Sequence, residues 1–321
     1  MLSFVLRFQD SAFKPMTKVE IHKVNTLAGH QDCVYTVESG PEPHLFFSAG
    51  GDGVVAQWDL NDLESGRMLA KLDSSVYALC YYAERNVLII GQNFDGIHLI
   101  DLNERKQVGS INLGSSAIFD VKVLRDRIFV ALANGEVHIL DITTLKTIEV
   151  LSYSDKSARS ISFSTLNGHL AVGYSDNMVR IFNLKDFSLL HEIEAHKISV
   201  FTVRYTPGER YLISGSRDAH LKIWDVQQDY TLKESVVAHM YAINHLDFSA
   251  DGKHFVTCSM DKSIKVWDAE TFQLLKVIDK ARHAGHGTSV NKLLWTDHNN
   301  LLVSASDDRS ISIWDITFNL S

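Results

Sequence analysis

His196, Ser214 and Asp218 are the residue types that act as base, nucleophile and orienting acid in a hydrolytic triad. An enzyme needs such a set once, whereas this chain contains it four times. In each copy a Trp-Asp pair begins 28 residues after the histidine, and another aspartate stands six residues before the tryptophan. The hydroxyl residue stands four residues before that aspartate. The sets are His30, Ser48, Asp52 and Trp58; His196, Ser214, Asp218 and Trp224; His239, Thr257, Asp261 and Trp267; and His286, Ser304, Asp308 and Trp314.

The segments around these residues share one pattern of secondary structure. A Ser/Thr-rich strand end leads to a tight turn containing aspartate, and then to a strand with alternating apolar and polar residues. The segments are SAGGDGVVAQWDL, SGSRDAHLKIWDV, CSMDKSIKVWDA and SASDDRSISIWDI. Three further copies lie between the first two, with Ile100, Leu140 and Phe182 in place of tryptophan. The seven equivalent positions are 40 to 47 residues apart, which indicates a repeat architecture.

The chain resembles the WD40 repeat family over nearly its whole length. The resemblance implies an all-β fold, a seven-bladed β-propeller with four-stranded blades around a central channel. Only seven residues follow Trp314, too few for a turn and another strand. We therefore expect residues 17–27 to supply the fourth strand of the last blade and to close the ring.

The resemblance also implies a hydrogen-bonded network in each good repeat, from tryptophan to the hydroxyl, to histidine and to aspartate. We predict that all sixteen residues of the four sets are structural, and that the chain has no catalytic, cofactor-binding or metal-binding residues. His283 and His286 form an H-x-x-H pair, but His286 already belongs to a repeat. Zinc sites generally need four ligands in compact pairs.

Composition limits the classes of function. The net charge is −8 with a pI of about 6.0, and no stretch clusters Lys and Arg, so nucleic acid is not an expected partner. No run of 18 apolar residues is present, so we expect no membrane span. Three cysteines at unrelated repeat positions favour a reducing compartment, and we expect a cytoplasmic protein. Residues 1–15 are expected to be a disordered tail or an extension upstream of a start at Met16, with the propeller over 16–321.

In this family the residues five positions after the histidine, and those just before the turn aspartate, often contact partners on the upper face. Aromatic residues occupy the first of these positions on three consecutive blades. Aromatic and arginine side chains commonly dominate interface energies. We expect a patch for an apolar or acidic peptide segment; the alternative is that the aromatics pack between blades. The candidate residues are Tyr35, Tyr77, Phe119, Arg159, Phe201, Arg217 and Met260.

We expect a non-catalytic scaffold or adaptor that presents a rigid propeller face to protein or peptide partners, as a monomeric ring within a larger hetero-complex. The Trp-Asp-x-Arg motif of ubiquitin-ligase receptors is absent, since the four sites read WDLN, WDVQ, WDAE and WDIT. One rival is a reader of modified peptides that holds a lysine-bearing tail between Tyr35, Tyr77 and Phe119. Another is a propeller enzyme with chemistry at the channel mouth, because a fold alone does not define function.

Overall fold

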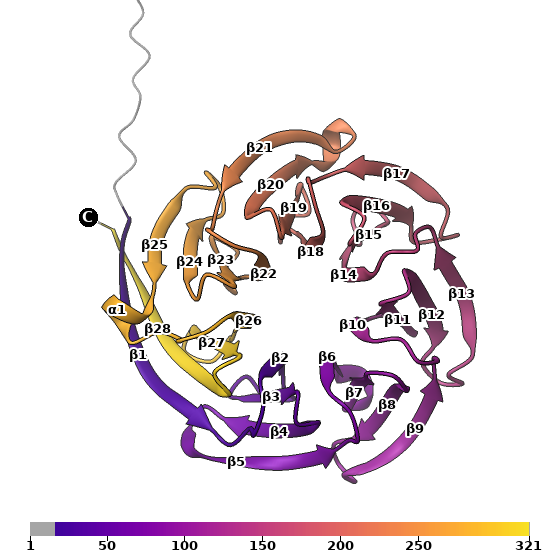
Figure 1. Ribbon diagram of the computed structural model, residues 1–321, viewed down its shortest axis with the longest axis horizontal. Helices are drawn as coiled ribbons and strands as arrows, with labels where there is room; N and C mark the ends of the chain where they lie inside the picture. The colour runs from indigo at the N-terminus through magenta and orange to yellow at the C-terminus, as the bar shows by residue number, and fades with distance from the viewer. Residues whose placement is uncertain (1–16, 321) are drawn as a thin grey trace, which may run out of the picture.

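Seven four-stranded antiparallel sheets form the blades of a ring around a central channel (Figure 1). This computed structural model describes residues 17–320, so the expected tail at residues 1–15 lies outside the described residues. Within blades 1 to 6 the chain runs from the innermost strand outward, and consecutive strands pair with each other. The prediction of a seven-bladed β-propeller is confirmed.

Each of blades 1 to 4 consists of four consecutive strands, ordered from the channel outward. Blade 1 contains β2 (Val34–Ser39), β3 (Leu45–Gly50), β4 (Val54–Asp59) and β5 (Asp62–Lys71). Blade 2 contains β6 (Val76–Tyr82), β7 (Val87–Gln92), β8 (Gly96–Asp101) and β9 (Lys106–Asn112). Blade 3 contains β10 (Ile118–Leu124), β11 (Arg127–Leu132), β12 (Glu136–Asp141) and β13 (Thr147–Ser152). Blade 4 contains β14 (Ala158–Ser164), β15 (His169–Tyr174), β16 (Met178–Asn183) and β17 (Leu189–Glu194).

The last three blades follow the same order, apart from the outermost strand of blade 7. Blade 5 contains β18 (Val200–Tyr205), β19 (Tyr211–Ser216), β20 (His220–Asp225) and β21 (Thr231–Val237). Blade 6 contains β22 (Ile243–Phe248), β23 (His254–Ser259), β24 (Ile264–Asp268) and β25 (Leu274–Ile278). Blade 7 contains β26 (Val290–Trp295), β27 (Leu301–Ser306), β28 (Ser310–Leu320) and β1 (Thr17–Ala28). The short helix α1 (Lys280–His283) precedes blade 7.

Strand β1 closes the ring. It pairs antiparallel with β28, and the register runs from Thr17 opposite Leu320 to Ala28 opposite Ser310 (Figure 1). Val19 packs into the apolar cluster between blades 6 and 7, and Leu27 into the cluster between blades 7 and 1. The expectation that the N-terminal segment supplies the last strand is confirmed. The pairing also covers the backbone edge of β28, which would otherwise be exposed.

The hydrophobic core lies between the blades. Each of the seven apolar clusters within the described residues combines side chains from two neighbouring sheets, which stack face to face. The cluster between blades 7 and 1, for example, joins Phe46 and Trp58 to Val303 and Ile313. This interface exists only because the two ends of the chain meet, so closure contributes a complete core cluster in addition to backbone pairing.

Candidate functional site: the mouth of the central channel

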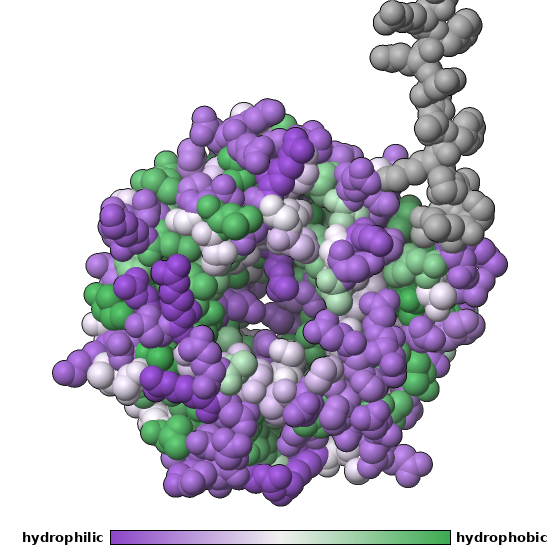
Figure 2. All heavy atoms as spheres, turned by 180° about the vertical axis from the view of Figure 1, so that it is seen from behind, coloured by the Kyte–Doolittle hydropathy of each residue, from purple (hydrophilic) through white to green (hydrophobic). Residues whose placement is uncertain are grey.

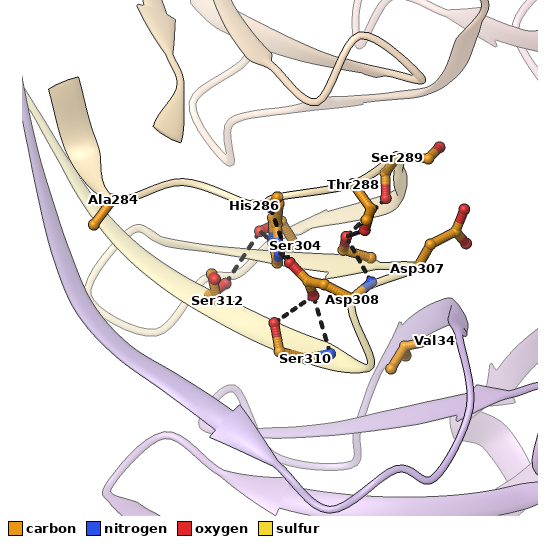
Figure 3. Close-up of polar contacts among 12 residues, drawn as sticks. Val34, Ala284, His286, Thr288, Ser289, Ser304, Asp307, Asp308, Ser310 and Ser312 are labelled. Atoms are coloured by element: carbon orange, nitrogen blue, oxygen red, sulfur yellow. Dashed lines mark hydrogen bonds and ion pairs between the residues drawn. The ribbon is translucent and has the colours of Figure 1, made fainter. Parts of the chain in front are cut away.

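The four repeated sets each form one chain of hydrogen bonds. The tryptophan Nε1 donates to the hydroxyl oxygen over 2.7–2.9 Å, and the histidine Nε2 lies 2.8 Å from the same oxygen. The histidine Nδ1 lies 2.9–3.2 Å from a carboxylate oxygen of the turn aspartate. Because an ionised carboxylate only accepts, we place the imidazole proton on Nδ1, so the hydroxyl donates to Nε2. Figure 3 shows His286 between Ser304 and Asp308 in blade 7.

The turn aspartate links two segments of each blade. In blade 5, Asp218 accepts hydrogen bonds from the backbone N–H of Lys197, on the loop that enters the blade, and of His220, the first residue of β20. Burial opposes ionisation of Asp218, but the hydrogen bonds from His196 and these N–H groups outweigh it and lower the pKa of the carboxyl. The Ser214 hydroxyl is fully buried, so no substrate carbonyl can reach it. The arrangement serves to fasten the blade entry to the turn.

A β-bulge occurs at the same place in all seven blades, at the start of the innermost strand. In the pairing with the second strand, one residue of the innermost strand is skipped. This residue has no direct partner on the second strand. A bulge re-aims the side chain of the extra residue. Here all seven bulge residues line one cavity of 310 Å³ at the mouth of the channel. They are Tyr35, Tyr77, Phe119, Arg159, Phe201, Asn244 and Asn291.

The bulge residues of blades 1 to 5 form a continuous arc of stacked groups. The rings of Tyr35 and Tyr77 meet edge to face with centroids 4.7 Å apart. The Tyr77 ring lies parallel to Phe119, with centroids 5.8 Å apart. The Arg159 guanidinium carbon lies 4.0 Å from the Phe119 centroid and 4.4 Å from that of Phe201. These side chains line the cavity at the channel mouth and also pack against their counterparts on neighbouring blades.

Two asparagines complete the mouth on the opposite arc. Asn244 donates to the carbonyl oxygen of Val290 at 2.8 Å, and Asn291 donates to the carbonyl oxygen of Val34 at 2.9 Å. Each amide thus bridges its own blade to the next one. The mouth consequently has one aromatic and cationic side and one amide side.

The comparison with protein families follows the same repeats. The family model described as "WD domain, G-beta repeat" matches residues 21–59, 187–225, 230–268 and 278–315. Those four segments contain the four complete hydrogen-bonded sets, within a ring of seven blades. The chain belongs to the WD40 repeat family.

Curated WD40 proteins are similar to parts of this chain. "WD repeat-containing protein 26 homolog" of Arabidopsis thaliana is 23% identical over 204 residues, which are 62% of this chain and 35% of the relative. "Small ribosomal subunit protein RACK1" of Medicago sativa is 31% identical over 162 residues, 50% of this chain and 42% of the relative. "THO complex subunit 3" of Arabidopsis thaliana is 22% identical over 207 residues, 63% and 64% of the two chains. The match to the first of these relatives therefore covers about a third of that protein.

The three WD40 repeats without tryptophan replace the tryptophan and its hydroxyl partner with apolar packing. Their hydroxyl positions hold Ile90, Val130 and Val172, which are fully buried in the same clusters as Ile100, Leu140 and Phe182. The sequence contained this signal, since these three positions lie ten residues before the substituted tryptophans. The turn aspartate persists in one of these repeats, where Asp176 pairs with Arg180 at 2.8 Å.

The remaining two predicted contact residues lie on the rim of the WD40 ring. Arg217 and Met260 are exposed beside the turn aspartates and do not line the cavity. Two residues that sequence reasoning missed stand close by: Met240 and Tyr241 are 81% and 61% exposed. The Met240 N–H donates to Asp261, which places this loop on the same face as Met260. In the sequence, the signal for these exposed residues was a Met-Tyr pair that directly follows the histidine of the repeat.

Below the mouth the channel is lined by charged side chains. A second cavity of 600 Å³ shares His245 and Lys292 with the mouth, so the two cavities meet at these residues. Lys122 lies 3.9 Å from Asp120, and Arg204 lies 3.1 Å from Asp247. Figure 2 shows the opening at the centre of one face, with largely hydrophilic walls in its depth.

The remaining chemical features set limits on the site. The described part of the chain contains no group of three or more His, Cys, Asp or Glu side chains placed to hold a metal ion. Among helices within residues 17–320, none is long and apolar enough to cross a membrane. Burial lowers the pKa of His245 well below its usual value, so this imidazole at the junction of the two cavities is neutral near pH 7.

Acidification should destabilise the ring through the networks. Burial lowers the folded-state pKa of His196 and His239 below the ordinary value of 6.5. The unfolded chain therefore binds protons first, and stability that is complete above about pH 6.5 is lost as the pH falls. The pKa values of Asp218 and Asp261 are also lowered in the folded state. Below about pH 4 these two groups therefore reduce the stability further as the pH falls.

Thermal melts at about pH 7.5, about pH 6 and about pH 5 would measure this effect, with a falling melting temperature as the expected result. The variant His196→Gln should show a shallower fall, because one titrating group is gone. A melting temperature that stays constant or rises on acidification would contradict the proposed neutral histidines.

Proposed function

We propose that this protein is a non-catalytic interaction platform that binds a protein or peptide partner at the mouth of its channel. The observation that carries the proposal is the convergence of seven bulge residues on one cavity, five of them aromatic or arginine in a continuous stack. Such a surface is formed before binding, so little conformational entropy is lost on association. The exposed Met240, Tyr241 and Met260 extend the surface outward from the mouth.

Several relatives are named as components of assemblies, among them "THO complex subunit 3" and "Eukaryotic translation initiation factor 3 subunit I". We therefore propose that this ring, over residues 16–321, is one subunit of a hetero-complex. The three free cysteines, Cys33, Cys80 and Cys258, support a reducing compartment such as the cytoplasm. With a net charge of −8, the proposed partner is a protein or peptide and not a nucleic acid.

A reader of modified lysine is less well supported by the geometry. Tyr35, Tyr77 and Phe119 do face one cavity, and Asp120 also lines it. However, the protein's own Arg159 already occupies the position of a bound cation, between Phe119 and Phe201. A lysine-derived cation would meet like charge there and would lose the ring faces that the guanidinium covers.

Affinity capture from the native host tests the proposed platform. The triple variant Tyr35→Ala/Tyr77→Ala/Phe119→Ala should lose most of the partner protein that wild type retains, as measured by quantitative mass spectrometry. Large aromatic side chains at an interface are the residues whose truncation costs most affinity. Leu166→Ala is the matched control, because Leu166 is 79% exposed on the loop after β14, at the other end of that innermost strand.

The capture has two informative results, provided that both variants melt at the temperature of wild type. Partners that disappear with the triple variant and remain with Leu166→Ala support the channel mouth as the binding surface. Partners that remain with the triple variant place the binding surface elsewhere on the ring and contradict the proposal.

A further inference from the structure

Arg159 has an unusual environment for an arginine at a protein surface. Its guanidinium lies between the rings of Phe119 and Phe201, 4.0 Å and 4.4 Å from their centroids. Burial lowers the pKa of Arg159 to about 10, so the group is still charged at neutral pH. Within residues 17–320, the structure shows no carboxylate within ion-pair distance of this guanidinium and no hydrogen bond from it.

Two cations below the mouth, Lys122 and Arg204, differ from Arg159 in this respect. Lys122 lies near Asp120, and Arg204 lies near Asp247, so their charges are matched inside the protein. The two aromatic rings cover the two faces of the Arg159 guanidinium, so its N–H donors lie in the plane between the rings. These planar donors form the fork that fits a carboxylate. Charge-assisted pairs of this kind are short and directional. The matching anion for Arg159 is thus expected from outside the chain.

The charge around the mouth is consistent with an anionic occupant. Arg159 and Lys292 line the cavity against a single carboxylate, Asp120. That carboxylate already accepts the backbone N–H of Ile161 at 2.8 Å and lies 3.9 Å from Lys122. The residues that line the mouth therefore include two cations and one carboxylate, although the whole chain carries a net charge of −8.

We propose that the channel mouth selects a partner peptide in which an aspartate or glutamate adjoins an aromatic or aliphatic residue. The carboxylate binds the Arg159 fork, and the apolar neighbour packs on the arc formed by Tyr35 and Tyr77. A cavity of 310 Å³ is at the lower end of the usual range for ligand sites, so it takes a short segment. This inference rests on the proposed function, because it names the chemistry of the partner at the same surface.

Selection of random linear peptides displayed on phage, with the purified ring as bait, tests the inference. Wild type and Leu166→Ala should both enrich sequences with Asp or Glu beside Phe, Tyr, Trp or Leu. Arg159→Met, which keeps an unbranched side chain without the charge, should lose the preference for acidic residues. Arg159→Lys should retain part of it, because the charge remains and the fork does not. Thermal melts must show that all four baits are folded.

One enriched peptide then gives a quantitative test by fluorescence anisotropy. Changing its acidic residue to the corresponding amide should weaken binding to wild type at least about tenfold, which is about 1.4 kcal/mol. The same change should make no difference to binding by Arg159→Met, because the two groups form one interaction. Enrichment of basic or neutral peptides, equal affinity of acid and amide, or no enrichment at all would overturn the inference.

The outcomes separate this inference from the proposed function. Peptides that need Tyr35, Tyr77 and Phe119 but show no charge preference leave the platform intact and remove only the role of Arg159. Conversely, acidic peptides that need Arg159, combined with native partners that persist in the triple aromatic variant, support the selectivity of the mouth and contradict its use as the main partner site.

Discussion

Val19→Asp should lower the melting temperature by at least about 5 °C, whereas Val24→Asp should leave it within about 1 °C of wild type. Both valines lie in β1, but Val19 is 4% exposed and Val24 is 46% exposed. Val19 packs in the core between blades 6 and 7, and a carboxylate there would be buried without a partner. Val24 stands at a bulge in the pairing with β28, where its side chain reaches solvent.

The size of the effect follows from what β1 holds together. Loss of a buried apolar side chain and burial of an unpaired charge are among the few mechanisms that cost more than about 3 kcal/mol. If β1 detaches, blade 7 also loses its outermost strand, and Leu27 leaves the cluster that joins blades 7 and 1. Thermal unfolding followed by circular dichroism gives the comparison. Equal melting temperatures for the two variants would show that the ring does not depend on closure by this strand.

Asp218→Ala should lower the free energy of unfolding by about 2–4 kcal/mol. The change leaves His196 Nδ1 and the backbone N–H groups of Lys197 and His220 without their acceptor. A buried donor that loses its acceptor costs about 1–3 kcal/mol of stability. Because water reaches part of this site, the costs of the three donors do not simply add. Asp186→Ala is the matched control, since Asp186 accepts hydrogen bonds from Ser188 in an exposed turn.

Urea unfolding of both variants measures the difference, and the control should lose no more than about 0.5 kcal/mol. Below its lowered melting temperature, Asp218→Ala should retain partner binding, because the network lies away from the channel mouth. The contrary result would be a variant that keeps wild-type stability and loses all function. Such a variant would revive the interpretation of His196, Ser214 and Asp218 as a catalytic set.

The architecture could be predicted from sequence because its signals are local. His196, Ser214, Asp218 and Trp224 meet within one blade, so their sequence separations are set by strand and turn lengths and repeat from blade to blade. The same regularity locates the degenerate blades through Ile100, Leu140 and Phe182. Closure by β1 was predictable from counting, since the last repeat lacks a strand that the N-terminal segment can supply.

The candidate site was only partly predictable. The position of Tyr35, Tyr77, Phe119, Arg159 and Phe201 in the repeat was visible, but their contacts were not. Each is a bulge residue, and a bulge is a property of strand pairing that no spacing within one strand reveals. The exposure of Met240 and Tyr241 likewise depends on which loop residues the turn leaves uncovered.

The sequence by itself determined the number of blades, their boundaries, the strand that closes the ring and the residues of the four networks. Only the tertiary structure decided that Arg159 lies between Phe119 and Phe201, and that Arg217 and Met260 stand outside the cavity. The physical reason is the range of the interactions. Spacing within a repeat reports contacts inside one blade, whereas the mouth joins residues about 40 apart that meet only when the ring curves and closes.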